Sequence, residues 1–198
     1  MKILFYSLIV LLLSPTFNIA TPKNSLSVTD VISKNKNLSE FYKYLKKAQL
    51  DLILNKNISW NWTIFAPNNE AFLKLKKVNN DLLNDMALLR NLLMDHILIG
   101  EKSSKNLNKK MSNEKTVSNK PLNLYLEDEL YVKDMVVINE DYRARNGIVH
   151  SIACVMFVQP SVDDDRLNDS IQKSFPVTSC CMRNEAEINF WKSSLKSR

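Results

Sequence analysis

Apolar residues in the first half of the chain recur at helical spacing. Between residues 38 and 54 they follow one another at intervals of 4, 3 and 4, with lysines mostly off that face. They are Phe41, Leu45, Ala48 and Leu52. Residues at these intervals share one side of an α-helix, so the pattern predicts an amphipathic helix over 38–54.

Turn residues separate this helix from a strand and further helices. The run 58–66 contains Trp60, Trp62, Ile64 and Phe65 and predicts a buried strand, which Pro67 and the two asparagines after it end. Gly100 is a natural helix stop, so it ends the last helical pattern of this half. Besides the helix described above, helices are predicted over 25–33, 70–75 and 82–99.

The period changes in the second half, where short β-branched or apolar runs alternate with turn residues. Strands are predicted over 122–126, 130–132, 135–138 and 148–158. Helices therefore precede a mostly antiparallel sheet on which they pack, which predicts an α+β domain ending near Pro160.

Three segments follow from this organisation. We expect residues 1–20 to be a signal peptide, 21–160 the folded domain and 161–198 a C-terminal extension that holds two cysteines. The extension is acidic at 163–165 and has an apolar pattern near its end. It either packs on the domain or recruits a partner.

The N-terminus has the pattern of a secretory signal peptide. Lys2 precedes an apolar stretch over 3–13, and the turn-prone Ser14-Pro15 then leads to Ala20, near which cleavage is expected. This stretch is shorter than the roughly 20 apolar residues that a helix needs to cross a bilayer. We therefore expect a secreted, extracellular protein without a transmembrane anchor.

Asn-x-Ser/Thr sequons agree with secretion. Of these acceptors, we expect Asn37 or Asn57 to carry a glycan. The sequons begin at Asn37, Asn57, Asn61 and Asn168.

The chain has three cysteines, Cys154, Cys180 and Cys181, too few for a disulfide-stapled scaffold. One bridge is expected in an oxidising compartment. Cys154 paired with a tail cysteine would tie the extension to the domain, and the odd thiol could link two chains into a dimer. Alternatively, Cys154 is a buried apolar residue and the tail cysteines pair elsewhere. No Cys-x-x-Cys pattern and only two histidines argue against a metal site.

The formal net charge of +6 is unevenly distributed. Residues 101–120 contain six lysines against two glutamates, with Asn and Ser between them, which predicts an exposed basic loop. Such a loop is either simply solvated or a docking site for a polyanion such as a sulfated glycosaminoglycan. Nucleic acid is not expected, because no aromatic residues are interleaved. The lysines are Lys102, Lys105, Lys109, Lys110, Lys115 and Lys120.

No catalytic arrangement is visible in the sequence. His150 lies in a predicted strand with Ile148 and Ile152 on the same face, and His96 shares a helical face with apolar residues. Both histidines are expected to be hydrogen-bonded core residues. Without a Ser/His/Asp, Cys/His or paired-carboxylate pattern, we expect neither an enzyme nor a cofactor.

Four segments together resemble the fasciclin domain family. Its first signature box resembles TIFAPNNEAFLKL at residues 63–75, and its second resembles NGIVHSIACVM at 146–156. Its Tyr-His segment resembles LLMDHILIG at 92–100, and the start of its second helix resembles LSEF at 38–41. Both glycines of the chain fall at these positions, and the resemblance covers residues 26–160.

The resemblance implies a fasciclin-like fold and an extracellular adhesion or matrix-associated module. Such modules bind integrins, matrix proteins or other surfaces through exposed loops and the Tyr-His region. Asp95 stands where the family usually has Tyr, so Asp95 and His96 are the adhesion candidates, with only His96 carried over. Dimerisation through Cys180 or Cys181 would add avidity. Two other functions stay open: glycosaminoglycan binding through the basic loop, and carriage of an apolar small ligand.

Overall fold

The computed structural model of the chain describes residues 26–107, 112–133, 135–158, 181–182 and 184–196. Its α-helices are α1 Val28–Lys34, α2 Ser39–Lys47, α3 Leu50–Leu54, α4 Asn69–Asn79, α5 Met86–Met94 and α7 Glu185–Lys196. Short 3-10 helices cover Lys36–Leu38 and Asp81–Leu83. The strands are β1 Trp62–Pro67, β2 Ile97–Ile99, β3 Ser112–Lys115, β4 Pro121–Leu126, β5 Leu130–Val132, β6 Met135–Ala144 and β7 Gly147–Ile152.

The strands form one sheet in the order β2-β1-β7-β6-β5-β4-β3. β1 and β7 are parallel, with Trp62 opposite Gly147, and all other neighbours are antiparallel. The predicted mostly antiparallel sheet is thereby confirmed. A bridge between Leu98 and Thr116 links β2 at one edge to the chain just after β3 at the other. The sheet therefore curls until its two edges nearly meet.

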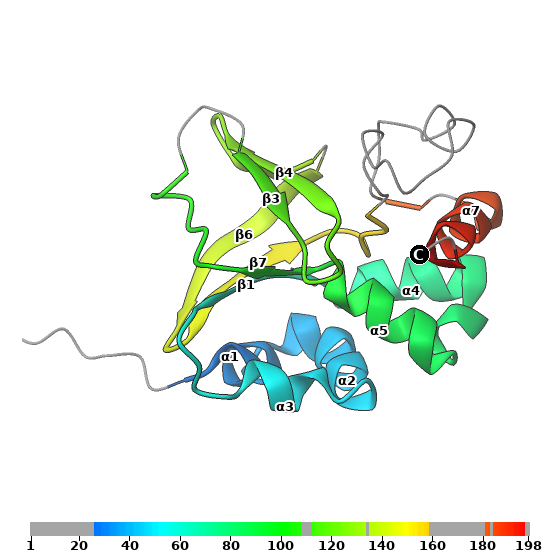
Figure 1. The fold of residues 1–198 in the computed structure, drawn as a ribbon, viewed down its shortest axis with the longest axis horizontal. Helices are drawn as coiled ribbons and strands as arrows, with labels where there is room; N and C mark the ends of the chain where they lie inside the picture. The colour runs from blue at the N-terminus through cyan, green and yellow to red at the C-terminus, as the bar shows by residue number, and fades with distance from the viewer. Residues whose placement is uncertain (1–25, 108–111, 134, 159–180, 183, 197–198) are drawn as a thin grey trace, which may run out of the picture.

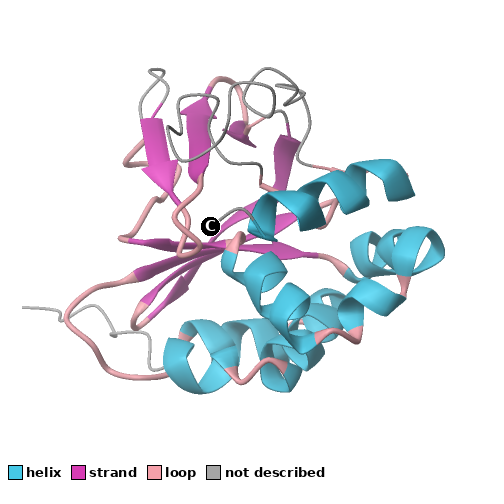
Figure 2. Cartoon of the chain, turned by 45° about the vertical axis from the view of Figure 1, so that its right-hand side comes forward, coloured by secondary structure: helices cyan, strands magenta, loops and turns pink. Residues whose placement is uncertain are grey.

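The helices gather on one side of this sheet. Figures 1 and 2 show α1 to α5 packed beside β1 and β7, with β3 and β4 away from the helices. Two hydrophobic clusters result, one shared by the helices and the sheet and one enclosed by the curled strands. In β1, Ile64 contributes to the first cluster and Phe65 to the second. All six residues of β1 are buried, which explains why its sequence is apolar except for Thr63, whose hydroxyl donates to the backbone O of Gly100.

The predicted helix over 38–54 is wrong in one respect. The structure divides it into α2 and α3, because Gln49 adopts a left-handed conformation with φ of 58°. This turn lets Leu50 and Leu54 join the helix-side core while the side chain of Leu52 is exposed.

The predicted helix over 82–99 is also too long. Helix α5 ends at Met94, and Ile97–Ile99 forms β2, which pairs with Trp62–Ile64 of β1. The apolar run after α5 thus makes its backbone hydrogen bonds to β1 in the sheet. Tertiary pairing overrides the helical pattern at this point.

The predicted starts and turns around the two signature-like segments are largely confirmed. Asn68 caps α4 by accepting a 2.9 Å hydrogen bond from the backbone N of Ala71. Gly147 has φ of 152°, and a Cβ built on it would lie 2.1 Å from the backbone O of Trp62. Asn146, before it, does not have a positive φ; its side-chain amide accepts from the backbone N of Val28 and donates to the backbone O of Leu54.

The second half differs from the predicted strands mainly in length. β6 runs to Ala144 with bulges in its pairing to β7. β7 ends at Ile152, and the chain continues to Val158 as buried irregular structure. The described part of the extension packs on the domain, where the buried Trp191 of α7 meets Phe157 edge-on at 5.2 Å.

Candidate functional site

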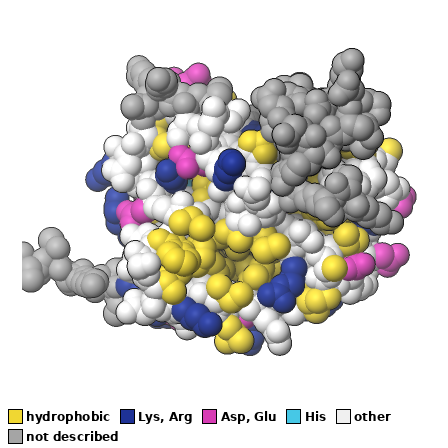
Figure 3. All heavy atoms as spheres, viewed as in Figure 1, with side chains coloured by type: hydrophobic (Ala, Val, Ile, Leu, Met, Phe, Trp, Pro, Cys, Tyr) yellow, Lys and Arg dark blue, Asp and Glu magenta, His cyan; other side chains and the backbone are white. Residues whose placement is uncertain are grey.

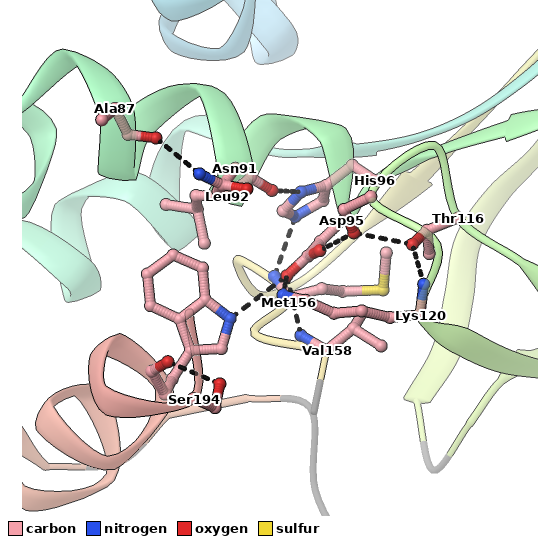
Figure 4. Close-up of polar contacts among 12 residues, drawn as sticks. Ala87, Asn91, Leu92, Asp95, His96, Thr116, Lys120, Met156, Val158 and Ser194 are labelled. Atoms are coloured by element: carbon pink, nitrogen blue, oxygen red, sulfur yellow. Dashed lines mark hydrogen bonds and ion pairs between the residues drawn. The ribbon is translucent and has the colours of Figure 1, made fainter. Parts of the chain in front are cut away.

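Asp95 closes α5, and its side chain lies in the protein interior with no exposed area. A carboxylate at a helix C-terminus faces the negative end of the helix dipole, so it needs cationic or hydrogen-bonding partners. Figure 4 shows Lys120 and Val158 pointing at this carboxylate. Its Oδ2 accepts from Lys120 Nζ at 2.7 Å, Val158 N at 3.1 Å and Trp191 Nε1 at 3.3 Å, and its Oδ1 accepts from the Ser118 hydroxyl.

These partners come from parts of the chain that are far apart in sequence. Ser118 and Lys120 belong to the turn between β3 and β4, Val158 follows β7, and Trp191 lies on α7. The ammonium of Lys120 also lies 5.0 Å from the ring centroid of Trp191. Burial raises the pKa of Asp95, while the charge of Lys120 and the hydrogen bonds oppose that rise. The Asp95 cluster, defined as Asp95, Ser118, Lys120, Val158 and Trp191, therefore locks α5, a turn, the end of the sheet and α7 together.

His96 is a neutral core histidine. Its Nε2 lies 2.8 Å from the backbone N of Met156, which can only donate, so Nε2 accepts. Nδ1 then carries the proton and donates to the backbone O of Leu92 at 2.8 Å. Burial lowers the pKa of His96 to about 4. The expected core role of this side chain is thus seen directly.

His150 is held in the same way. Its Nδ1 accepts from the backbone N of Asp141 at 3.2 Å, and its Nε2 donates to the backbone O of Lys102 at 2.9 Å. The imidazole stacks on Phe65 at 5.2 Å, and burial lowers its pKa. Backbone groups thus hold both ring nitrogens of each histidine, and the residues that the structure describes contain no cluster of His, Cys, Asp and Glu able to hold a metal ion.

The exposure that direct adhesion through Asp95 and His96 would need is not present. Both side chains are fully buried, and α7 covers the Asp95 carboxylate through the indole of Trp191. The burial of Asp95 has an electrostatic reason. A buried ion pair is stable only when both oxygens of the carboxylate accept hydrogen bonds, so other parts of the chain must enclose it.

The predicted basic loop over 101–120 is partly wrong. Its later part forms β3, and Lys120 is buried against Asp95 rather than solvated. Lys102 forms a 2.7 Å ion pair with Glu114. Lys105 and Lys115 are exposed as expected. Lys109 and Lys110 lie outside the described residues.

The sequons fall on the surface wherever the structure describes them. Asn37, Asn57 and Asn61 are exposed, and Asn168 lies outside the described residues. Exposure is required for a mature glycan but does not show that one is attached.

A disulfide joins Cys154 to Cys181, 27 residues apart in sequence. The predicted tie between the domain and the extension is therefore confirmed, and Cys181 is the tail partner. Cys180, the candidate for a link between chains, lies outside the described residues.

An open cavity of about 470 Å³ lies between α4 and this disulfide. Apolar side chains dominate its lining, and Lys74 is its charged member. The apolar members include Leu75, Val78, Phe157 and Met182. Among the described residues, no helix combines the length and apolar character that crossing a membrane requires.

Sequence reasoning missed the partners of Asp95. Lys120 looked like one more lysine of a basic loop, and Trp191 like one apolar residue of a tail helix. The available signal was the carboxylate itself, because an Asp inside an apolar segment needs a cation from elsewhere. Nothing local to the sequence indicates which lysine supplies it.

Comparisons with known proteins agree with this architecture. Residues 36–158 match the family model of the fasciclin domain. Human periostin is 24% identical over 151 residues, which cover 74% of this chain and 18% of periostin. The solved FAS1 domain pair from the insect cell adhesion molecule fasciclin I superposes with a TM-score of 0.58 at 20% identity, covering 67% of this chain and 51% of that chain.

The matched chain therefore spans less than a fifth of periostin and about half of the fasciclin I domain pair. The likeness to fasciclin I concerns the fold. The family model, however, spans more than half of the sequence and includes both signature-like segments. The chain belongs to the fasciclin domain family.

Proposed function

We propose that this chain is secreted and acts as a non-enzymatic adhesion or matrix-associated module that binds a protein at the cell surface or in the matrix. The observation that carries this proposal is the fasciclin domain itself, with fasciclin I, named as a cell adhesion molecule, sharing its fold. The Cys154–Cys181 disulfide supports an oxidising, extracellular compartment. The N-terminal pattern of a signal peptide points the same way.

In this proposal Asp95 and His96 position other groups rather than contact the partner. Through them, α5, the turn after β3 and the segment after β7 keep one arrangement. The loops around this cluster then present a fixed surface. A surface that is already ordered loses less conformational entropy on binding, which raises the affinity of a small binding site. A direct contact through Asp95 would first require α7 to move away.

The test is cell adhesion to plates coated with the secreted full-length chain. We expect adhesion that a divalent-cation chelator abolishes, as an integrin-type receptor requires. If only soluble heparin abolishes adhesion, the partner is a polyanion rather than an integrin-type receptor. A coated, correctly folded chain to which no cell type adheres would contradict the proposal.

A second candidate function is binding of a sulfated glycosaminoglycan through Lys105 and Lys115, because both ammonium groups are exposed. The charge-reversed K105E/K115E double variant should leave a heparin column at lower salt. The matched control is K74E/K77E, with the same charge change on the exposed face of α4. If both double variants lose the same amount of heparin retention, the retention depends on the net charge of the chain and not on a site at Lys105 and Lys115.

A third candidate is carriage of an apolar ligand in the cavity of about 470 Å³ between α4 and the disulfide. A cavity of this size and lining suits an acyl chain, and Lys74 could pair with an acidic head group. Native mass spectrometry of the secreted chain should then show a bound species of discrete mass. A chain that leaves purification without one, and that takes up no added fatty acid, would remove this candidate.

A further inference from the structure

A patch of exposed hydrophobic side chains lies beside the start of β1. Figure 3 shows hydrophobic side chains gathered on the face that carries β1 and α3. We define the Trp60 patch as Leu52, Ile53, Trp60 and Ile99, which are 64%, 41%, 44% and 56% exposed. Contiguous exposed apolar surface on a water-soluble domain usually has an occupant.

Trp60 is the aromatic centre of this patch. The ring centroids of Trp60 and Trp62 lie 5.9 Å apart at an interplanar angle of 82°, so the two rings meet edge to face. Trp62 lies opposite Ile99 in the antiparallel pair of β1 and β2, and facing residues of such a pair share one side of the sheet. Trp62, which is itself 5% exposed, is thus the common neighbour of Trp60 and Ile99.

Asn57 lies in the same connecting segment as Trp60. It is exposed, and its amide makes no hydrogen bond to any residue that the structure describes. Three residues span at most about 10 Å of extended chain, so the Cα atoms of Asn57 and Trp60 are close enough for the first sugars of a glycan on Asn57 to reach the neighbourhood of Trp60. The sequon is complete, with Ser59 as its third residue.

Asn61, on the other side of Trp60, has different surroundings. Its Nδ2 donates to Glu101 Oε2 at 3.1 Å, and Glu101 also binds Arg143 at 3.1 Å. The hydroxyl of its sequon Thr63 donates to the backbone O of Gly100 at 2.6 Å. A glycan on Asn61 would disturb this network, whereas one on Asn57 would disturb no bond of the described residues.

We propose that Asn57 carries an N-linked glycan whose first sugars pack on Trp60 and cover the Trp60 patch. The C–H face of a pyranose is apolar and suits an exposed indole, which offers a large flat area with little conformational entropy to lose. The proposal rests on the secretion proposed above. It assigns the occupant of this face to the chain itself, so the binding surface for a partner lies elsewhere.

The attachment is a group transfer from a lipid-diphosphate-linked oligosaccharide in the secretory pathway. The Nδ2 of Asn57 attacks C1 of the first N-acetylglucosamine. The C1–O bond to the diphosphate breaks as the C1–N bond forms, the amide loses one proton, and the lipid diphosphate leaves. Because this transfer precedes folding, the later structure needs only to leave Asn57 at the surface.

The first measurement is the mass of the full-length chain secreted from eukaryotic cells, before and after enzymatic deglycosylation. We compare the wild type with N57Q and with the matched control N61Q on the other side of Trp60. N57Q should lose one glycan, and N61Q should keep it. Occupancy that N57Q leaves unchanged would overturn the site.

The second measurement is acrylamide quenching of tryptophan fluorescence. Of the three tryptophans, Trp62 is 5% exposed and Trp191 fully buried, so Trp60 provides the accessible signal. Complete deglycosylation should raise the accessible quenching by roughly twofold, while trimming to one N-acetylglucosamine should raise it less. The W60F variant should show neither change.

Four outcomes would overturn the proposal, in whole or in part. A glycan on Asn57 whose removal leaves quenching unchanged would refute the packing on Trp60. A glycosylated chain that still binds lipid vesicles or dimerises through Trp60, and loses this in W60A, would assign the patch to that partner. A chain found only inside cells, without any glycan, would refute secretion and the glycan together, whereas a secreted chain unmodified at Asn57 would refute the glycan alone.

Discussion

Lys120 neutralises a carboxylate that water cannot reach. Its side chain and that of Asp95 are both fully buried, and the ammonium lies 2.7 Å from Oδ2. Removing one member of such a pair leaves an uncompensated charge in the interior, which costs more than the intact pair contributes. The pair therefore matters chiefly because neither partner tolerates the loss of the other.

Replacement of Lys120 by methionine tests this pair. We expect K120M to lower the free energy of unfolding at neutral pH by about 3–5 kcal/mol, measured by urea denaturation. The control K115M changes an exposed lysine nearby and should stay within about 0.5 kcal/mol of the wild type. The D95N/K120M double variant should lose less than K120M; a loss equal to or above that of K120M would contradict the coupling.

The neutral state of His96 makes stability depend on pH. Its pKa is about 4 in the folded chain against an ordinary 6.5, so between these values the unfolded chain binds more protons. Stability from this group is fully present above about pH 6.5 and falls as the pH drops toward 4, by about 3 kcal/mol in total. Urea denaturation from pH 4 to 7.5 measures this slope.

Other buried groups titrate in the same range and require a comparison. The pKa of His150 is also lowered and adds a slope of the same sign, whereas the raised pKa of Asp95 contributes the opposite sign. The difference between wild type and H96Q isolates His96, and the slope of H96Q should be shallower. An NMR titration in which His96 of the folded chain changes protonation near pH 6.5 would contradict its buried, neutral state.

At this scale, the burial of the two histidines could be predicted from the sequence, whereas the buried ion pair could not. Apolar neighbours at helical and strand spacing predicted interior positions for His96 and His150, and both are buried. The same reasoning placed Lys120 in a solvated loop, because a lysine among Asn, Ser and Lys has no local sign of burial. Its partner Asp95 lies 25 residues away, which no periodicity connects.

Among the secondary-structure elements, the parallel pair β1 and β7 depends most on one residue. At Gly147 the two strands begin opposite Trp62, and a Cβ there would lie 2.1 Å from the Trp62 backbone O. No rotamer relieves a clash between Cβ and backbone, so one of the two strands would have to shift.

The G147A variant should therefore lose about 3–4 kcal/mol of unfolding free energy or more, by the same urea assay. The control is G100A, where an added Cβ meets only the flexible Cε of Lys102 at 3.7 Å. Its positive φ still costs about 1–2 kcal/mol. If both alanine variants lose the same amount, the close approach of β1 and β7 does not explain the glycine.

Element types were more predictable than element ends. The helical and alternating patterns located most helices and strands, because burial of one face or both is encoded locally. The division of α2 from α3 follows a left-handed residue at Gln49 that no spacing announces, and the change from α5 to β2 after Met94 depends on pairing with distant chain. β1 supplies that pairing for Ile97–Ile99, so no window around α5 could reveal it.

For the molecule as a whole, the described helix of the C-terminal extension, α7, packs as part of the folded unit. α7 lies outside residues 36–158, the part matched by the fasciclin model, yet its Trp191 donates to Asp95 in the interior. The resemblance of the signature segments predicted the domain well, but it stops at residue 160 and gave no place for α7. From its composition alone, the extension could equally pack on the domain or recruit a partner.

The Cys154–Cys181 disulfide should control whether α7 stays in place. The C154A/C181A variant should lose roughly 3 kcal/mol of unfolding free energy, because the unfolded chain gains the freedom of the opened loop. Amide hydrogen exchange should show α7 losing protection before the sheet does. The C180A control should keep the unfolding free energy and the protection of α7. Equal protection of α7 with and without the bridge would show that Trp191 packing alone holds the helix.

The parallel pairing of β1 with β7 also fixes the order in which the molecule can assemble. β1 is synthesised early, but its neighbour β7 emerges only after β2 to β6, several seconds later at roughly 5–20 residues per second. Through that interval the most apolar strand of the sheet has an unsatisfied edge, and only the local helices can shield it. Dense local contacts cannot make this fold fast, because closing the long loop between the first and last strands comes before the core is complete. A sheet joined in this way leaves a buried strand without one of its neighbours for most of the time that synthesis of the domain takes.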